Sequence, residues 1–99
     1  MDLTTENFQS ETAEWLVLVD FWAPWCGPCQ AMMPVLADFE AQTGIKVGKV
    51  NVDEQGELAA QFRVMSIPTF IIMKDGKPVE QFVGGKTLDE LTQAVEKHK

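Results

Sequence analysis

The chain has 99 residues, of which 45% are hydrophobic and 23% charged, and its formal net charge is −7 at pH 7. This length is enough for one hydrophobic core and too short for two, so residues 1–99 are expected to form a single domain. The negative charge, with no basic cluster to offset it, argues against nucleic acids and membranes as partners, and no apolar run is long enough to span a bilayer. Because the first six residues are acidic and polar, they do not resemble a secretory signal, and a cytoplasmic location is expected.

The first third of the chain predicts a short helix followed by a buried strand. A threonine at position 4 or 5 can cap a helix that ends near Thr12 and has Phe8 as its main apolar contact. Residues 15–22 are apolar at odd and even positions alike, which is typical of a strand that is covered on both faces in a parallel sheet. Asp20 is the exception in this run, which makes it a candidate functional residue.

A helix and a second strand complete a βαβ unit. The helix is expected over residues 27–43, because four inward-facing side chains repeat with helical spacing and Gly44 provides a stop. These side chains are Cys29, Met32, Met33 and Leu36. Residues 45–52 are expected to form the second buried strand, and Leu58 and Phe62, four residues apart, indicate a short helix after it.

The last third of the chain predicts a β-hairpin and a final helix. Strands at residues 69–73 and 78–83 flank an Asp-Gly pair, which is among the strongest hairpin signals and makes the two strands antiparallel. Thr87 and Glu90 have the spacing of a capping box at the start of the helix. The inner face of this helix is expected to be formed by Leu88, Leu91 and Val95. Together the elements predict an α/β fold with one mixed sheet and helices on both faces.

The only two cysteines form the motif Cys26-Gly27-Pro28-Cys29 at the start of the expected helix. Unpaired backbone amides and the positive end of the helix dipole then lie beside Cys26, which favours the thiolate, the nucleophilic form of a cysteine. Gly27 and Pro28 suit the first turn, because proline lacks only an amide that has no partner there. Cys29 lies on the same helix face as Cys26, so the two thiols can close a disulfide ring.

A zinc site is the main alternative for a Cys-x-x-Cys pair. Structural zinc takes four ligands, and the chain has no second cysteine pair. Its only histidine, His98, lies near the C-terminus, where we expect it to be exposed to solvent. We therefore expect a redox-active pair and no metal site.

Two segments resemble the thioredoxin family. Residues 19–29, with the sequence VDFWAPWCGPC, are similar to the active-site segment of that family, and residues 66–69, with the sequence SIPT, are similar to its cis-proline loop. Gly84 follows a strand, as the family's glycine in the substrate groove does. Only Met1–Leu3 remain for an N-terminal strand, which is expected to be short or absent. The resemblance implies the thioredoxin fold and a protein-disulfide reductase; thioredoxin is itself a well-known example of a reactive Cys-x-x-Cys thiol.

Asp20 and Lys49 are candidate residues for proton transfer. The resemblance implies that Asp20 is a buried carboxylate behind the cysteines that accepts, through water, the proton of Cys29. Burial would raise the pKa of Asp20. Lys49 shares strand parity with Val47, so its ammonium group is expected to point inward and pair with Asp20. A solvated Asp20 and an exposed Lys49 are the alternatives.

The resemblance also implies a surface for client proteins. A cis peptide bond before Pro68 would lie close to the cysteines and leave the backbone of Ile67 free to bind an extended segment as an added strand. The alternative for Pro68 is an ordinary proline at the start of a strand. The substrate-binding residues are expected to be Trp25, Gly27, Pro28, Ile67, Pro68 and Gly84. Trp22 is expected in the core, and the core or its rim is expected to contain Met32, Met33, Met65 and Met73.

In the expected mechanism, the Cys26 thiolate attacks a disulfide of a client protein and Cys29 resolves the mixed disulfide, leaving Cys26 and Cys29 oxidised. No bound cofactor is expected. The resemblance implies re-reduction by a thioredoxin reductase with electrons from NADPH, and clients such as ribonucleotide reductase, peroxiredoxin and methionine sulfoxide reductase. A monomer is expected.

Two other functions are compatible with the sequence. One is an oxidant or isomerase of the same fold, although Gly27-Pro28 resembles the reductants of the family rather than its His-containing oxidants. The other is a binding module or chaperone in which the fold serves as a clamp. A measured redox potential distinguishes the first, and a cysteine-free variant that keeps its biological role would indicate the second.

Overall fold

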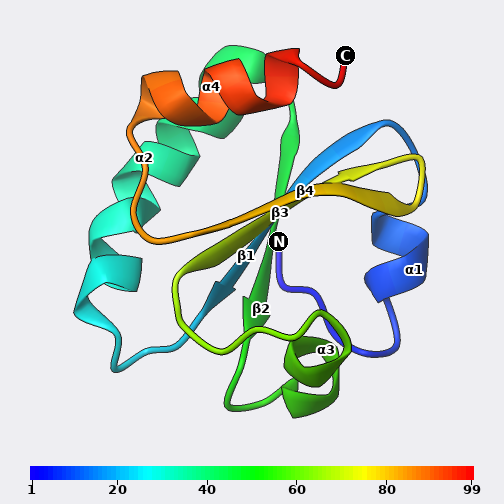
Figure 1. Ribbon diagram of the computed structural model, residues 1–99, viewed down its shortest axis with the longest axis vertical. Coiled ribbons are helices and arrows are strands. Elements are labelled where there is room, and N and C mark those ends of the chain that lie inside the picture. The colour runs from blue at the N-terminus through cyan, green and yellow to red at the C-terminus, as the bar shows by residue number, and fades with distance from the viewer.

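The computed structural model describes residues 1–99 and contains one four-stranded sheet with the strand order β2-β1-β3-β4 (Figure 1). The strands are β1 (Leu16–Trp22), β2 (Lys46–Asn51), β3 (Thr69–Lys74) and β4 (Lys77–Val83). The helices are α1 (Phe8–Glu11), α2 (Gly27–Thr43), α3 (Gly56–Gln61) and α4 (Leu88–Glu96). β1 is parallel to β2 and antiparallel to β3, and β4 is antiparallel to β3, so the expected βαβ unit, hairpin and mixed sheet are confirmed.

The sheet separates two apolar clusters. Helices α2 and α4 lie on one side of it and α1 and α3 on the other (Figure 1). Along β1, Leu16 and Leu18 pack under α2 and α4, whereas Val17, Val19 and Phe21 pack against the side of α1 and α3. All five side chains are buried, which explains why the strand is apolar at both parities. None of the helices combines the length and the apolar character that crossing a membrane requires.

The N-terminal strand is reduced to a single parallel bridge between Asp2 and Lys49. The Leu3 amide donates to the Lys49 carbonyl (2.8 Å), and the Lys49 amide donates to the Met1 carbonyl (2.8 Å). Leu3 is buried where Gly48 leaves room for it, since a side chain at position 48 would collide with that of Leu3. The short strand expected from the sequence is confirmed, and these contacts attach it to the edge of β2.

Most helix boundaries are those that the sequence predicts. Helix α2 ends at Gly44, whose φ of 72° is left-handed, and the Thr87–Glu90 capping box is formed at the start of α4. The first helix is shorter than expected. Thr4 caps the turn that leads into it: the Thr4 amide donates to Asn7 Oδ1 (2.7 Å) and the Asn7 amide donates to Thr4 Oγ1 (3.3 Å), which is the reciprocal pattern of a capping box. The four-residue α1 begins only after this turn.

Candidate functional site

The two cysteines lie where β1 leads into α2. Cys26 is the N-cap of α2, Cys29 lies in its first turn, and a disulfide joins them with 5.2 Å between their Cα atoms. Both side chains are buried. The Cys29 amide lies 3.2 Å from Cys26 Sγ, so it can donate to a negative charge on that sulfur when the pair is reduced. The expected ring is confirmed, and no group of three or more His, Cys, Asp or Glu side chains is arranged to hold a metal ion.

The loop before β3 contacts the cysteines from a second direction. The Ile67-Pro68 peptide bond is cis, as the resemblance implies, and the Ile67 carbonyl oxygen lies 3.9 Å from Cys26 Sγ. The Gly84 amide donates to the Pro68 carbonyl (2.8 Å), which fixes the end of β4 to the same loop. The structure therefore brings Cys26, Ile67, Pro68 and Gly84 together, although they are far apart in the sequence.

The surface beside Cys26 is formed by exposed residues of the β1–α2 turn. Gly27 and Pro28 are exposed between the two buried cysteines. The Trp25 side chain is 69% exposed, and its indole N–H donates to Asp53 Oδ2 (2.9 Å), which fixes the ring. Asp53 is not among the residues predicted from the sequence. Its position just after β2 could have indicated it as a site residue, because the carboxyl ends of the parallel strands β1 and β2 meet at one edge of the sheet.

Trp22 packs beside the cysteines rather than deep in the core. The residue is half-buried and contacts the small cluster of Cys26, Cys29 and Ala23. Its indole Nε1 is buried without a hydrogen-bond partner. The expectation that Trp22 lies in the core is therefore wrong, because it is the last residue of β1, where the sheet ends beside the cysteine turn.

Asp20 is buried on the face of the sheet that α2 covers. It is 1% exposed and has the strand parity of Leu16 and Leu18, whose side chains pack under α2. Its Oδ1 has no hydrogen-bond partner. Burial raises the pKa of Asp20 from 3.8 to about 7, and the nearby charge of Lys49 acts in the opposite direction and more weakly. The alternative of a solvated carboxylate is excluded.

Lys49 is opposite Asp20 in the register of β1 and β2, but the two side chains form no ion pair. The ammonium group instead lies 3.5 Å from Met33 Sδ, and the residue is only half-buried. The expected pairing with Asp20 is therefore wrong. The long side chain of Lys49 places its ammonium group where the group keeps part of its hydration. An ion pair with the buried carboxylate of Asp20 would remove that hydration.

Two further expectations are wrong. Met65 is not in the core or its rim but is 94% exposed, whereas Met32 and Met73 are buried. His98 is not solvated, since its Nε2 lies 2.8 Å from Glu80 Oε1 and its side chain is only 23% exposed. The reason is the course of α4, whose end reaches the middle of β4.

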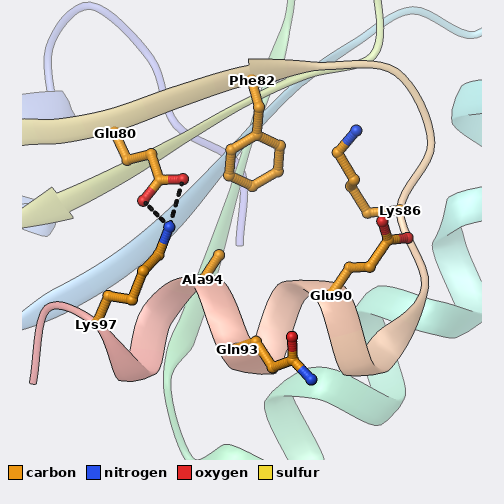
Figure 2. A pocket seen from close by; sticks show the side chains of 7 residues that line it. All are labelled: Glu80, Phe82, Lys86, Glu90, Gln93, Ala94 and Lys97. Carbon is orange, nitrogen blue, oxygen red and sulfur yellow. Dashed lines mark hydrogen bonds and ion pairs between the residues drawn. The ribbon is translucent and has the colours of Figure 1, made fainter.

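The same carboxylate also binds Lys97, which reaches from α4 to Glu80 of β4 (Figure 2). The hydrogen bond from His98 and the ion pair with Lys97 hold the pKa of Glu80 below its usual value. Phe82 and Ala94 lie beside this pair in a cleft of about 480 Å³ between β4 and α4. No cysteine lines this cleft, so it is distinct from the disulfide site.

Comparisons with known proteins give the same family at each level. The Thioredoxin family profile matches residues 1–97. The chain is 47% identical over 97 residues to thioredoxin of Bacillus subtilis (strain 168), which covers 96% of this chain and 93% of that protein. It is 46% identical over 97 residues to thioredoxin of Chlamydia caviae, covering 97% of this chain and 95% of that protein.

Solved structures are similar over nearly the whole chain. A single-site mutant of the thioredoxin from Halobacterium salinarum NRC-1 has a TM-score of 0.93 and 35% identity, covering 98% of this chain and 88% of that chain. A second chain has a TM-score of 0.89 and 27% identity, covering 98% of this chain and 93% of its own. It comes from a structure described as the structural basis of the thiol resolving mechanism in yeast mitochondrial 1-Cys peroxiredoxin via glutathione/thioredoxin systems.

Proposed function

The chain belongs to the thioredoxin family, and we propose that within its redox pair Cys26 is the attacking thiol and Cys29 the resolving thiol. The protein is a thiol-disulfide oxidoreductase that reduces disulfides with this pair. One observation carries the assignment of the two roles. Cys26 is the N-cap of α2 and receives the Cys29 amide at 3.2 Å, so the helix start stabilises a thiolate at Cys26 and not at Cys29.

The reaction proceeds in two exchange steps. First, the Cys26 thiolate attacks one sulfur of the client disulfide, a mixed disulfide forms, and the other client sulfur leaves as a thiolate. Second, Cys29 loses its proton and attacks Cys26 Sγ, which releases the second client thiolate and closes the Cys26–Cys29 disulfide. Two electrons pass to the client, and the pair must then be reduced again.

We assign Asp20 the role of proton acceptor for Cys29 in the second step. Asp20 lies on the sheet face that α2 covers, and the Cys29 side chain is buried on the inner side of α2. The Oδ1 of Asp20 has no hydrogen-bond partner in the protein, and a pKa of about 7 allows the carboxylate to take up a proton near neutral pH. A water molecule between the two groups would carry the proton. Lys49 acts on this step through its charge, which favours the ionised form of Asp20.

We propose that a client segment binds in extended form beside Ile67. The backbone N–H and C=O of Ile67 take part in no backbone hydrogen bond, so both are available to an added strand. The surface around this backbone would be formed by Trp25, Gly27, Pro28, Ile67 and Gly84, whereas Pro68 is buried beside Ile67. It surrounds Cys26, so a bound segment would present its disulfide to the attacking sulfur.

A member of this family acts on disulfide clients and is served by a thioredoxin reductase. We propose that the reductase here uses NADPH, that the protein works as a monomer in the cytoplasm, and that its clients include ribonucleotide reductase, methionine sulfoxide reductase and peroxiredoxin. Support for the last client is the similarity to a chain from a structure concerned with peroxiredoxin resolution.

Matched cysteine variants test the assignment. We expect Cys29→Ser to accumulate mixed disulfides with clients through Cys26, and Cys26→Ser to form none, because only the second step needs Cys29. The adducts are purified from cell extract after thiols are blocked, and are identified by mass spectrometry. Insulin reduction should fall to background in both variants. Trapping through Cys29 in the Cys26→Ser protein would reverse the roles, and a cysteine-free variant that keeps its biological role would instead indicate a binding module.

A further inference from the structure

Arg63 is the only arginine of the chain and lies in the turn between α3 and the cis-proline loop. Its φ is 56°, in the left-handed region. The Arg63 amide donates to the Ala60 carbonyl (3.1 Å) and the Val64 amide donates to the Ala59 carbonyl (2.9 Å), which is the Schellman pattern at a helix end. Glycine is the usual residue at this position, because a Cβ is unfavourable there. The turn itself therefore gives no reason for an arginine.

No group of the protein holds the guanidinium of Arg63. The side chain forms no hydrogen bond and no ion pair, although the chain has 15 acidic residues. Of the seven lysines, three each pair with a glutamate and four form no ion pair. A residue in an unfavourable backbone conformation, with its charged end unused within the fold, indicates a partner outside it.

Arg63 lies a short distance along the chain from the surface that surrounds Cys26. Three residues separate it from Ile67, whose carbonyl oxygen lies 3.9 Å from Cys26 Sγ, so the Cα atoms of Arg63 and Ile67 are at most about 14 Å apart. Between them, Met65 is almost fully exposed. The loop from α3 to β3 lies at the same end of the molecule as the turn from β1 to α2 (Figure 1). An extended client advances about 3.3 Å per residue, so positions up to about four from its reactive cysteine can reach Arg63.

We propose that Arg63 determines client specificity by binding a carboxylate, from an Asp or Glu within about four residues of the client's disulfide cysteine. The planar guanidinium can bind both oxygens of a carboxylate at once. It also provides a positive charge at the docking surface of a protein whose net charge is −7, so an acidic segment finds a local attraction that the molecule as a whole does not offer. This inference rests on the proposed function, since it concerns the same site.

The test uses two disulfide peptides that differ only in carrying Glu or Gln at a position two to four residues from the disulfide cysteine. Wild-type protein in its reduced form should show a kcat/KM roughly two- to fivefold higher for the Glu peptide, as for an exposed ion pair, and added salt should reduce the difference. Arg63→Gly should remove the preference, leave kcat/KM for the Gln peptide unchanged and shift urea unfolding to higher concentration. Arg63→Lys should keep part of the preference.

The matched control is Lys77→Gln, which removes one exposed positive charge from the β3–β4 hairpin and should leave the preference intact. Equal kcat/KM for the two peptides with wild-type protein would overturn the inference, and so would a preference that persists in Arg63→Gly. Either result leaves the proposed function standing, because both peptides are still reduced. If wild-type protein reduces neither peptide, the proposed function itself fails and the inference falls with it.

Discussion

Replacing Asp20 with Asn should make the protein more stable at neutral pH and slower in turnover. Asp20 is 1% exposed, its Oδ1 has no hydrogen-bond partner, and burial raises its pKa to about 7. An ionised carboxylate at this position is poorly solvated, whereas asparagine never ionises. The change therefore removes an unfavourable charge from the fold and also removes the proton acceptor proposed for Cys29.

The size of the effect follows from the two pKa values. The folded pKa of Asp20 lies above the ordinary value of 3.8, so the folded state binds the proton more tightly than the unfolded state does. The free energy of unfolding of the wild-type protein is unaffected by Asp20 below pH 3.8. It falls by about 1.4 kcal/mol per pH unit between pH 3.8 and pH 7, and Asp20 lowers it no further above pH 7. The full difference is about 4 kcal/mol, and relaxation around the charge lowers it to about 2–4 kcal/mol.

Urea unfolding of the oxidised proteins between pH 4 and 8 measures this effect without titration of the thiols. The free energy of unfolding of Asp20→Asn minus that of wild type should increase with pH up to about pH 7 and then level off, whatever constant offset the amide introduces. Asp38→Asn, at an exposed position of α2, is the matched control and should show no such trend. A difference that stays flat between pH 4 and 8 would refute the argument from burial. Turnover of Asp20→Asn equal to that of wild type would refute the assigned proton transfer, for which a loss of up to about 10²-fold is expected because water can substitute in part.

Three other substitutions test the remaining parts of the structure. Thr87→Ala removes the side chain that caps α4 with Glu90 and should lower the free energy of unfolding by about 1 kcal/mol in urea; an unchanged midpoint would mean that the capping box contributes nothing. Gly84→Ala places a Cβ at a φ of 95° and should destabilise the protein by about 1–2 kcal/mol, so a stable alanine variant would contradict the left-handed backbone. Asp53→Asn weakens the hydrogen bond that fixes the Trp25 indole and should lower kcat/KM for protein disulfides by roughly two- to fivefold at unchanged stability; an equal kcat/KM would show that the ring needs no anchor.

The parts of the fold that local sequence controls could be predicted. The bounds of α2 follow from its apolar spacing and from Gly44, and the hairpin follows from Asp75 and Gly76, both of which have positive φ. The first helix could not be bounded in this way. Thr4 and Asn7 form the reciprocal bonds of a capping box, but only the four residues after Asn7 continue as an α-helix, which the capping signal alone does not determine.

The site could be predicted where its chemistry depends on neighbours in the sequence, and not where it depends on the conformation of long side chains. Cys26 and Cys29 lie in one helical turn, so their ring follows from their spacing. Strand register puts Lys49 opposite Asp20, but the register does not determine where a four-carbon stem places its charge. Met65 resembles a core residue by composition alone, and it has no periodic partner that would show whether it points inward.

The groups that the fold satisfies least well lie at the end of β1, just before the redox pair. The buried side-chain polar atoms without a partner are Asp20 Oδ1 and Trp22 Nε1, and both belong to the last three residues of β1, just before the cysteine turn. Elsewhere the sequence preferences match the observed structure, as in the capping box of α4 and the Asp-Gly turn between β3 and β4. A carboxylate kept partly protonated at neutral pH is of no use to a purely structural strand, whereas a thiol that must lose its proton inside the protein needs such a group nearby. We therefore expect that substitutions which improve stability most will concentrate at the carboxyl end of β1 and will slow disulfide exchange, since the same buried charge underlies both effects.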